Sequence, residues 1–333
     1  SNKTTEQTQY WQSLLVHGQA SSIKYPFESR GTHADEQHCA IQLDAEYTAR
    51  LVNQAQQAYN TKITELLLSA LSIALKDWSG DEQFIIDLER HGRETTLCEQ
   101  DTSQTIGWFT SLFPFGLDVA DCRVGEVIKK VKQNYRAIPD NGVGYGVLKY
   151  LLGESSQNSI DETPRLVVFN YLGQFDQVFN ESELFKPAKE LAGASVSRRR
   201  MLSHGLSFNG MLIDKRLSFN LTYDGVNFTA QQMQRLATFM VQALEAVIDH
   251  CCQQKHTQYL PIDFPLSTMT PERLNALSQD YQIQDLYPTS PLQAGLLYQS
   301  EVDESAYKTQ VLLSLKGQLD TQRFRQAWLD VAN

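Results

Sequence analysis

The sequence has none of the features typical of a membrane, secreted or nucleic-acid-binding protein. None of its apolar runs approaches the roughly eighteen residues that a membrane-spanning helix needs. The start, SNKTTEQTQYW, has neither the basic segment nor the apolar core of a signal peptide. Lys and Arg number 29 against 39 Asp and Glu, and the resulting net charge of −10 argues against binding to nucleic-acid phosphates. These absences predict an acidic, soluble, cytoplasmic protein with no nucleic-acid or membrane partner.

Cysteine is scarce, with five residues that form no CxxC pair and no metal-ligand spacing. An odd number with one adjacent pair, Cys251 and Cys252, is a poor disulfide framework, so we expect reduced thiols and no bound metal. An initiator Met is also lacking, and the last residues, AWLDVAN, stop inside a helical pattern. We therefore expect both ends to belong to a longer chain.

Helical and strand patterns alternate along the first part of the sequence. Apolar residues recur at helical spacing over 43–60 and 63–79, and the second stretch is apolar around most of its circumference, which predicts a buried helix. A short strand is expected at 82–89 and an amphipathic helix at 123–138. Residues 165–175 form a nearly continuous apolar run rich in β-branched and aromatic residues, which predicts an interior strand.

A hairpin and a long helix follow. Residues 206–214 and 216–225 alternate as two antiparallel strands around a tight turn at Asp214–Lys215, although this turn lacks the usual glycine. Thr229 and Gln232 form a capping box that opens a long helix. Strands interleaved with helices, with a hairpin present, predict an α/β (α+β) fold in which a mixed sheet is covered by helices.

The character of the sequence changes near residue 254. Residues 255–280 are polar and punctuated by proline, which predicts an interdomain linker with one short helix capped by Thr270. Residues 281–333 predict a truncated unit with the order helix–strand–helix. Its strand, at 306–317, needs backbone hydrogen-bond partners. We expect it to pair with an edge of the sheet in residues 1–254 or with a second copy of the chain in a dimer.

Four motifs carry most of the information about family. They are LERHGRE (88–94), SQTIGWFTSLFP (103–114), AIPDNGVGYGVLKY (137–150) and VVFNYLGQFD (167–176). None is specific alone; GVGYG, for example, matches no phosphate-binding loop. In this order they resemble the signatures of the epimerization domain of nonribosomal peptide synthetases, over about residues 9–250. The stretch LYPTSPLQAGLLYQS resembles the start of a condensation domain of the type that follows an epimerization domain.

The resemblance implies a chloramphenicol-acetyltransferase-like fold with two lobes around a V-shaped cleft. In that family the first lobe carries an HHxxxDG motif, which is absent here because all seven histidines are isolated. We therefore expect residues 1–254 to be the second lobe. The resemblance also implies the reaction: the parent domain epimerizes the α-carbon of an aminoacyl or peptidyl thioester. Its substrate is carried on the phosphopantetheine of a peptidyl carrier protein, among adjoining synthetase domains, and no cofactor or metal binds the domain directly. This sequence alone is expected to be inactive.

Glu89 is the candidate catalytic residue. Inverting an α-carbon requires a base on one face and an acid on the other, and the resemblance assigns one of these roles to the first Glu of the motif, here Glu89. A carboxylate with this task should lie at a partly dry cleft, where desolvation raises its pKa. His91 would lie on the same side if the strand continues. The competing interpretation of Glu89 is a strand-terminal acid in a surface ion pair.

Four further residues are expected to line the cleft or shape it. Asn170 and Tyr171 lie mid-strand, and by resemblance both face the cleft; the alternative for Asn170 is a structural hydrogen bond. Trp108 is expected to pack and form the cleft floor, and Tyr145 lies in a loop whose glycines set its conformation. Arg90 replaces the glycine usual in the family motif, so it either crowds the cleft or points outward.

Two further features concern charged residues near the motifs. Arg93 and Glu94 are expected to form a pair that holds the turn after the strand. The basic run SRRRM (197–201) is either a solvated loop or a docking surface for an anionic carrier protein. Two functions are kept as alternatives to epimerization. One is a condensation-domain lobe that forms peptide bonds, and the other is a non-catalytic carrier-protein docking module.

Overall fold

The computed structural model describes most of the chain, in two units. The described residues are 2–17, 25, 27–94, 101–120, 123–151, 164–174, 193, 195–281, 283–303, 307 and 310–332. Unit 1 comprises Ser1–Gln284 and unit 2 comprises Asp285–Asn333. No helix in the described part is long and apolar enough to cross a membrane.

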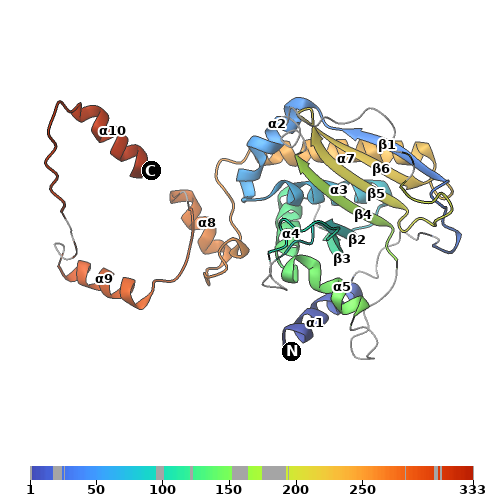
Figure 1. Cartoon of the computed structure of the whole chain (residues 1–333), viewed down its shortest axis with the longest axis horizontal. Helices are drawn as coiled ribbons and strands as arrows, with labels where there is room; N and C mark the ends of the chain where they lie inside the picture. The colour runs from blue at the N-terminus through green and yellow to red at the C-terminus, as the bar shows by residue number, and fades with distance from the viewer. Residues whose placement is uncertain are drawn as a thin grey trace. The chain divides into compact units, whose positions relative to one another are not determined.

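Within the described residues, unit 1 is built on one mixed sheet of six strands in the order β1-β6-β5-β4-β2-β3 (Figure 1). The strands are β1 (Glu36–Gln42), β2 (Gln83–Arg90), β3 (Ser111–Asp118), β4 (Val167–Gln174), β5 (Leu206–Ile213) and β6 (Arg216–Asp224). Strand β4 runs parallel to both of its neighbours, β2 and β5, and the other pairs are antiparallel. The predicted mixed sheet is confirmed, and β4 is an interior strand as expected.

Helices cover one face of this sheet. Helices α3 (Ile63–Ser79) and α7 (Ala230–Cys252) pack on each other, and α4 (Val124–Arg136) packs on both of them and on β3 (Figure 1). The predicted burial of α3 is confirmed, because its leucines are fully buried. Burying a leucine side chain contributes about 1.5–3 kcal/mol, so this helix anchors the layer that supports the sheet.

The other helices before β4 also pack against the sheet: α1 (Asn2–His17) and α5 (Val143–Tyr150) contact β3, and α2 (Ala45–Asn53) contacts β6. Short 3-10 turns are also present, namely η2 (Phe27–Ser29), η3 (Ala55–Tyr59) and η4 (Pro139–Gly142). Trp11 of α1 is fully buried, and its ring packs on those of Phe113 in β3 and Tyr145 in α5. Helix α1 thus joins the same core as the sheet.

The predicted capping box and the predicted hairpin turn are both present. The Thr229 hydroxyl caps α7 by accepting from the Gln232 backbone N–H, and the Gln232 side chain accepts from the Thr229 N–H. The turn between β5 and β6 places Asp214 and Lys215 at φ values of 50° and 58°. Both are left-handed, as a two-residue hairpin turn of type I′ requires, so the turn forms without glycine.

Residues 255–284 belong to unit 1. They form η5 (Pro261–Asp263) and α8 (Pro271–Asp280), and the expected Thr270 cap of α8 is present. The Asp263 carboxylate is fully buried and accepts from Lys132 Nζ at 2.6 Å and Arg136 Nη1 at 2.5 Å. Lys132 is fully buried too. A buried ion pair therefore fastens the proline-rich segment to α4.

Unit 2 contains α9 (Pro291–Val302) and α10 (Thr321–Ala332), the two helices expected there. The Ser290–Gln293 capping box opens α9. The predicted strand at 306–317 is wrong for the residues that the structure describes in it, because 310–316 carry no strand assignment and β1 to β6 make up the described sheet. A strand pattern yields a strand only where a neighbour satisfies its backbone groups. Pairing with a second copy of the chain stays a prediction.

Candidate active site

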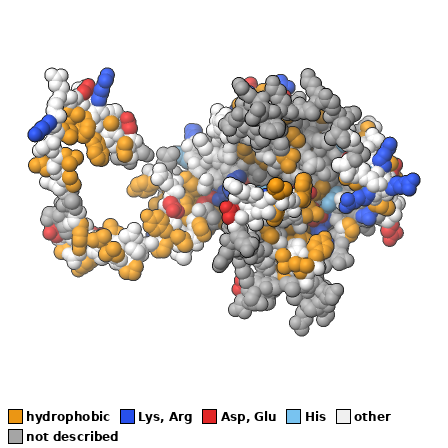
Figure 2. Space-filling view, in the orientation of Figure 1, with side chains coloured by type: hydrophobic (Ala, Val, Ile, Leu, Met, Phe, Trp, Pro, Cys, Tyr) orange, Lys and Arg blue, Asp and Glu red, His pale blue; other side chains and the backbone are white. Residues whose placement is uncertain are grey.

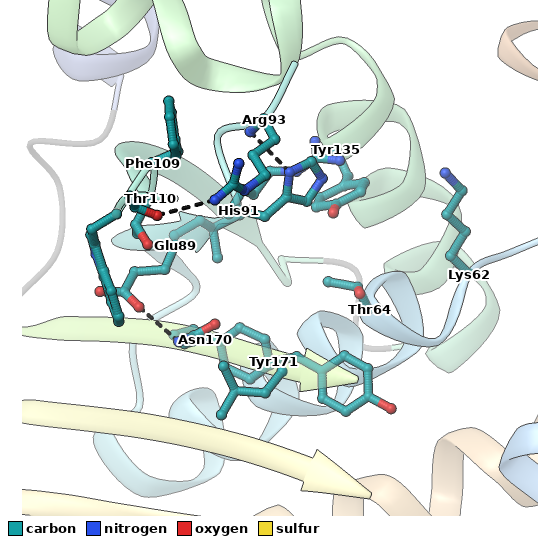
Figure 3. Close-up of a pocket in the computed structure, with 16 residues that line it drawn as sticks. Lys62, Thr64, Glu89, His91, Arg93, Phe109, Thr110, Tyr135, Asn170 and Tyr171 are labelled. Carbon is teal, nitrogen blue, oxygen red and sulfur yellow. Dashed lines mark hydrogen bonds between the residues drawn. The ribbon is translucent and has the colours of Figure 1, made fainter. Parts of the chain in front are cut away.

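A pocket of about 530 Å³ lies where the parallel strands β2 and β4 end (Figure 3). Residues from β2, the segment after it, β4 and α4 line it, among them Glu89, Arg90, Trp108, Tyr135 and Asn170. The carboxyl ends of parallel strands are a common place for ligand sites, because the connections diverge there and leave a crevice. The pocket combines aromatic walls with a few polar groups, as small-molecule sites do.

Glu89 is half-buried in this pocket and its carboxylate is held by an amide. Asn170 Nδ2 donates to Glu89 Oε2 at 2.7 Å (Figure 3). Burial raises the pKa of Glu89, and the charge of His204 opposes this rise without cancelling it. The interpretation of Glu89 as a surface ion pair is wrong, because Glu89 takes part in none of the ion pairs formed by the described residues.

The polar face of the sheet that carries Glu89 continues across its neighbours. Leu88 and Phe169 are in register, so the residues that follow them, Glu89 and Asn170, lie side by side. Asn170 is in turn in register with Asn209, and Asn209 with Asn220. One row of polar side chains therefore runs from β2 across β4, β5 and β6. Side chains of successive residues alternate between the faces of a strand, so this row lies opposite the buried aromatic residues of the core.

Arg90, at the position of the usual glycine, neither crowds Glu89 nor points into solvent. It follows Glu89 in β2 and so extends from the other face of the strand. Its Nη1 donates to Asn141 Oδ1 at 2.8 Å, and its guanidinium lies 5.1 Å from the centre of the Tyr135 ring. Arg90 thus joins β2 to the segment before α5 and leaves the Glu89 face open.

The predicted Arg93–Glu94 pair is wrong. The Arg93 guanidinium donates to the backbone carbonyls of Thr102 and Gly107 and lies over the Phe109 ring. Glu94 instead accepts from Asn141 Nδ2 at 2.9 Å. Arg93 therefore holds the returning segment 102–109 against the pocket, a long-range role that its neighbours in sequence did not reveal.

His91 lines the pocket but is mostly exposed. Its side chain is 63% exposed, its Nε2 lies 3.4 Å from Glu94 Oε1, and its Nδ1 accepts from the Arg93 backbone N–H (Figure 3). The strand ends at Arg90, so the extended geometry that would align His91 with Glu89 does not continue. His91 is a rim residue.

Trp108 is 90% exposed, so the prediction that it packs as the cleft floor is wrong, although it does line the pocket. The segment around it carries no helix or strand, and nothing in the described residues covers the indole. Asn170 and Tyr171 both line the pocket. As successive strand residues they extend from opposite faces of β4, and burial raises the pKa of Tyr171.

Tyr145 lies in the core and outside the pocket. It is 3% exposed, and its ring centre is 5.1 Å from that of Trp11. The residues expected to be a loop open helix α5, which turns this side chain toward α1. Gly142 just before the helix has φ +85°, and a Cβ there would lie 2.1 Å from Phe113. The predicted conformational role of this glycine is confirmed.

Sequence reasoning missed a cluster of three buried side chains that includes Asp87, a residue of the same strand as Glu89. His204 Nε2 and Asp87 Oδ2 are 2.8 Å apart, and Arg165 Nη1 lies 3.6 Å from Asp87 Oδ1. All three side chains are about nine-tenths buried. The available signal was the spacing of Asp87 and Glu89, since residues two apart in a strand share a face. No pattern in the sequence connected residue 204 to them.

The basic run at 197–201 is exposed, near the N-terminal end of β1. The backbone carbonyls of Arg198 and Arg200 accept from the N–H groups of Ala34 and His33, respectively, and residues 198–200 are exposed. Figure 2 shows Lys and Arg side chains gathered at this end of unit 1. Among the described residues no group of three or more His, Cys, Asp or Glu could hold a metal ion.

Comparisons with known proteins agree with this architecture. The condensation-domain family matches residues 1–265. One chain of the mycosubtilin synthase of Bacillus subtilis is 34% identical over 334 residues, 97% of this chain and 13% of that protein. Bacitracin synthase 3 of Bacillus licheniformis is 30% identical over 345 residues, 99% of this chain and 5% of that protein. The chain thus spans a small part of these relatives.

Solved structures share the fold. The epimerization domain from the third module of tyrocidine synthetase B superposes with a TM-score of 0.68 at 28% identity, over 77% of this chain and 57% of that one. The X-domain from teicoplanin biosynthesis superposes with a TM-score of 0.54 at 17% identity, over 75% of this chain and 56% of that one. The second likeness concerns the fold alone. The fold expected from the motifs is confirmed.

Proposed function

The chain belongs to the condensation-domain family of nonribosomal peptide synthetases, and we propose that residues 1–254 are the second lobe of an epimerization domain. Residues 281–333 are then the start of the condensation domain that follows, and 255–280 connect the two. Glu89 acts as one of two acid–base groups that invert the α-carbon of an aminoacyl or peptidyl thioester.

One observation carries this proposal: a carboxylate stands in a partly dry pocket with one oxygen held and the other free to react. Asn170 binds Glu89 Oε2, and none of the hydrogen bonds among the described residues reaches Oε1. Burial raises the pKa of Glu89 toward the range in which a carboxyl group both accepts and returns a proton. The likeness to a solved epimerization domain supports the same role.

In the proposed reaction the proton and the electron pair are both accounted for without a cofactor. The bond between the α-carbon and its hydrogen breaks, the proton moves to Glu89 Oε1, and the electron pair enters the thioester carbonyl as an enolate. A proton then returns to the opposite face of the same carbon. It comes from a second group, which is protonated when Glu89 is not. We assign this second group to the histidine of an HHxxxDG motif, which this sequence does not contain.

The substrate arrives on a carrier protein in this proposal. An aminoacyl or peptidyl group joined to phosphopantetheine as a thioester has the acidic α-hydrogen that the reaction needs, and the arm reaches into a pocket from a separate domain. Peptidyl carrier proteins and adjoining synthetase domains are therefore the proposed partners, and the phosphopantetheine belongs to the carrier.

Exchange with heavy water tests the proposal. The carrier protein is loaded with an L-aminoacyl group and incubated in D₂O with the synthetase that carries this chain; mass spectrometry and chiral chromatography then follow the product. We expect one deuterium at the α-carbon and a mixture of D and L product, with loss of at least about 100-fold in rate for Glu89→Gln. Glu82→Gln, which changes an exposed acid paired with Lys76, is the control. Full activity of Glu89→Gln would refute the proposal.

A condensation-domain lobe, which would form peptide bonds, is the second candidate, because the condensation-domain family matches residues 1–265 and a solved epimerization domain has the same fold. The same assay separates them when an acceptor aminoacyl carrier is added. Formation of a peptide bond with no deuterium at the donor α-carbon would favour condensation.

The chain of 333 residues by itself is expected to exchange no α-hydrogen, because it supplies one of the two acid–base groups. The check is the same exchange assay with this chain alone. Binding of a carrier protein without exchange, measured by titration, agrees with this expectation and with the docking module considered above. Measurable exchange by the chain alone would mean that both groups lie within it.

A further inference from the structure

Three consecutive residues between α4 and α5 have a left-handed backbone. Asp140 has φ 44° and ψ 39°, Asn141 has φ 54° and ψ 25°, and Gly142 has φ 85° and ψ −7°. Residues other than glycine usually enter this region one at a time, because their Cβ atoms crowd the backbone there. Within the described part of the chain no other three consecutive residues have a positive φ. The turn is therefore strained.

The residues on either side of Asn141 are each fixed by a contact with another element. Gln7 Nε2 of α1 donates to Asp140 Oδ2 at 2.6 Å. Gly142 lies against the Phe113 ring of β3, where a Cβ would approach to 2.1 Å. Strained conformations persist where such contacts determine them, and they are concentrated at functional sites. The contacts on both sides thus keep Asn141, the middle residue, in its left-handed conformation.

Asn141 uses both ends of its side-chain amide. Oδ1 accepts from Arg90 Nη1 at 2.8 Å, and Nδ2 donates to Glu94 Oε2 at 2.9 Å. Arg90 is the last residue of β2, and Glu94 ends the rim segment (91–94), which has no helix or strand to hold it. The Glu94 side chain is 16% exposed, so its carboxylate has little water to replace a lost donor. One amide therefore ties the rim segment to the end of the strand.

The rim segment in turn holds one wall of the pocket. Arg93 donates to two backbone carbonyls of segment 102–109, and its guanidinium carbon lies 4.3 Å from the centre of the Phe109 ring. Gly92 touches the same wall, since a Cβ there would lie 1.7 Å from the Phe109 carbonyl oxygen. Trp108 lines the pocket and is 90% exposed. A connected set of contacts therefore leads from the left-handed turn through the rim segment to an aromatic side chain at the pocket.

We propose that Asn141 is a positioning residue that shapes the pocket for its substrate. By joining Arg90 to Glu94 it fixes the rim segment, and the rim segment holds Trp108 against the bound acyl group. The left-handed turn is what brings the amide to both partners, because the backbone dihedrals set the direction in which a side chain leaves the chain. The proposal rests on the function proposed above, in which a thioester substrate binds beside Glu89.

The effect of Asn141 should fall on substrate binding and not on proton transfer. Glu89 is paired with Leu112 of β3 in the sheet, and its carboxylate is held by Asn170. Neither contact involves Asn141. A change that removes equal binding from the ground state and the transition state raises KM and leaves kcat unchanged. We therefore expect variants of Asn141 to raise KM for the carrier-bound substrate, whereas variants of Glu89 lower kcat.

Asn141→Gly tests the amide, because glycine accepts the left-handed backbone and has no side chain. The readout is deuterium uptake in the parent synthetase at several concentrations of the loaded carrier protein. We expect KM to rise by about tenfold, the order expected for the loss of a hydrogen bond to a charged group, with kcat unchanged. Lys215→Gly is the matched control, since Lys215 has φ 58° in the β5–β6 turn and does not line the pocket. It should leave both constants unchanged.

An exchange of chemical groups separates positioning from a role in the turn alone. Asn141→Asp keeps the acceptor for Arg90 but sets a second carboxylate against Glu94, so it should raise KM at least as much as Asn141→Gly. Adding Glu94→Gln supplies an amide that donates to the new carboxylate, and the double variant N141D/E94Q should return KM close to the wild-type value. If Asn141 served the turn alone, glycine would be harmless and E94Q would rescue nothing.

A second readout needs no turnover. The chain has four tryptophans, and with ¹⁵N-labelled tryptophan the Trp108 indole signal is assigned by its loss in Trp108→Phe. We expect Asn141→Gly to shift or broaden this signal and N141D/E94Q to restore it. The Trp78 signal is the internal control for an intact fold, because its ring lies on α3, 6.2 Å from that of Phe228. It should not change.

An unchanged KM or an unchanged Trp108 signal in Asn141→Gly would overturn the proposal, and so would a double variant no better than Asn141→Asp. If Asn141→Gly does not fold, Glu94→Ala removes the same hydrogen bond from the other side and must give the same two effects. The indole readout also separates the two proposals. A shifted Trp108 signal with a fully active E89Q would remove the role of Glu89 and leave that of Asn141. An unchanged signal with an inactive E89Q would do the reverse.

Discussion

Asn170 and Glu89, 81 residues apart in sequence, meet across the parallel pair β2–β4 with a 2.7 Å hydrogen bond from Nδ2 to Oε2. The amide orients the carboxylate and leaves Oε1 toward the pocket. A donor to a charged acceptor contributes about 1.5–3 kcal/mol. This single contact therefore has measurable consequences for both reactivity and stability.

Asn170→Ala should lower the rate of α-hydrogen exchange by about tenfold, since about 1.4 kcal/mol of lost orientation corresponds to a factor of ten. The assay is deuterium uptake by carrier-bound substrate in the parent synthetase. Asn209→Ala is the control, because Asn209 is the register neighbour of Asn170 on β5 and makes its hydrogen bond to Ser207. Equal losses in both variants would mean that the polar row, and not the contact to Glu89, matters.

Glu89→Gln should raise the free energy of unfolding at pH 7. Burial raises the folded-state pKa of Glu89, and an acid whose pKa is raised on folding contributes stability that is full below the unfolded pKa and lost as pH rises through the folded value. Glutamine keeps an acceptor for Asn170 and carries no charge. Denaturant unfolding at pH 7 and near pH 4 should show a gain at the first pH that shrinks at the second.

No gain at either pH would mean that the carboxylate is adequately solvated in the folded chain. Glu82→Gln serves again as the control, because the Glu82 side chain is 54% exposed and its surface pairing contributes little at any pH.

Asp263→Asn should destabilise unit 1 by about 3–5 kcal/mol, the usual cost of leaving a buried charge without its partner. Lys132 would remain fully buried with the Tyr59 carbonyl as its other contact. Burial already lowers the pKa of Lys132, against the opposing effect of Asp263, so the variant should also make stability fall more steeply as pH decreases. Thermal or urea unfolding measures both effects.

The comparison variant is Asp118→Asn, which removes a partly exposed pair with Lys130. It should cost about 1 kcal/mol or less. Similar losses in the two variants would argue that Asp263 contributes no more than a surface pair.

Asp224→Asn should make the fold less sensitive to acid while lowering its stability at neutral pH. Burial raises the pKa of Asp224, but hydrogen bonds from the Gly31 and Val226 N–H groups, Tyr25 and Asn227 outweigh it and lower the pKa overall. Such a group contributes stability above its unfolded pKa that is lost as pH falls through the folded value. Unfolding curves between pH 7 and pH 2 should converge for the two proteins at the acid end.

Much of the local structure followed from the sequence alone. The capping boxes at Thr229 and Ser290, the hairpin turn at Asp214 and the boundaries of α3 depend on residues within a turn or two of one another. The order of four motifs was sufficient for the family and the fold. The position of Glu89 at a strand end was enough to expect a cleft beside it.

The tertiary structure decided which side chains meet. Sheet register brings Asn170 to Glu89, and the segment before β5 brings His204 to Asp87 across 117 residues. Packing placed Tyr145 in the core, and Arg90, on the other face of β2 from Glu89, donates to Asn141, 51 residues away in sequence. Local signals arise from neighbours along the chain, whereas hydrogen-bond partners, burial and the charge on a carboxylate depend on elements that only the fold makes adjacent.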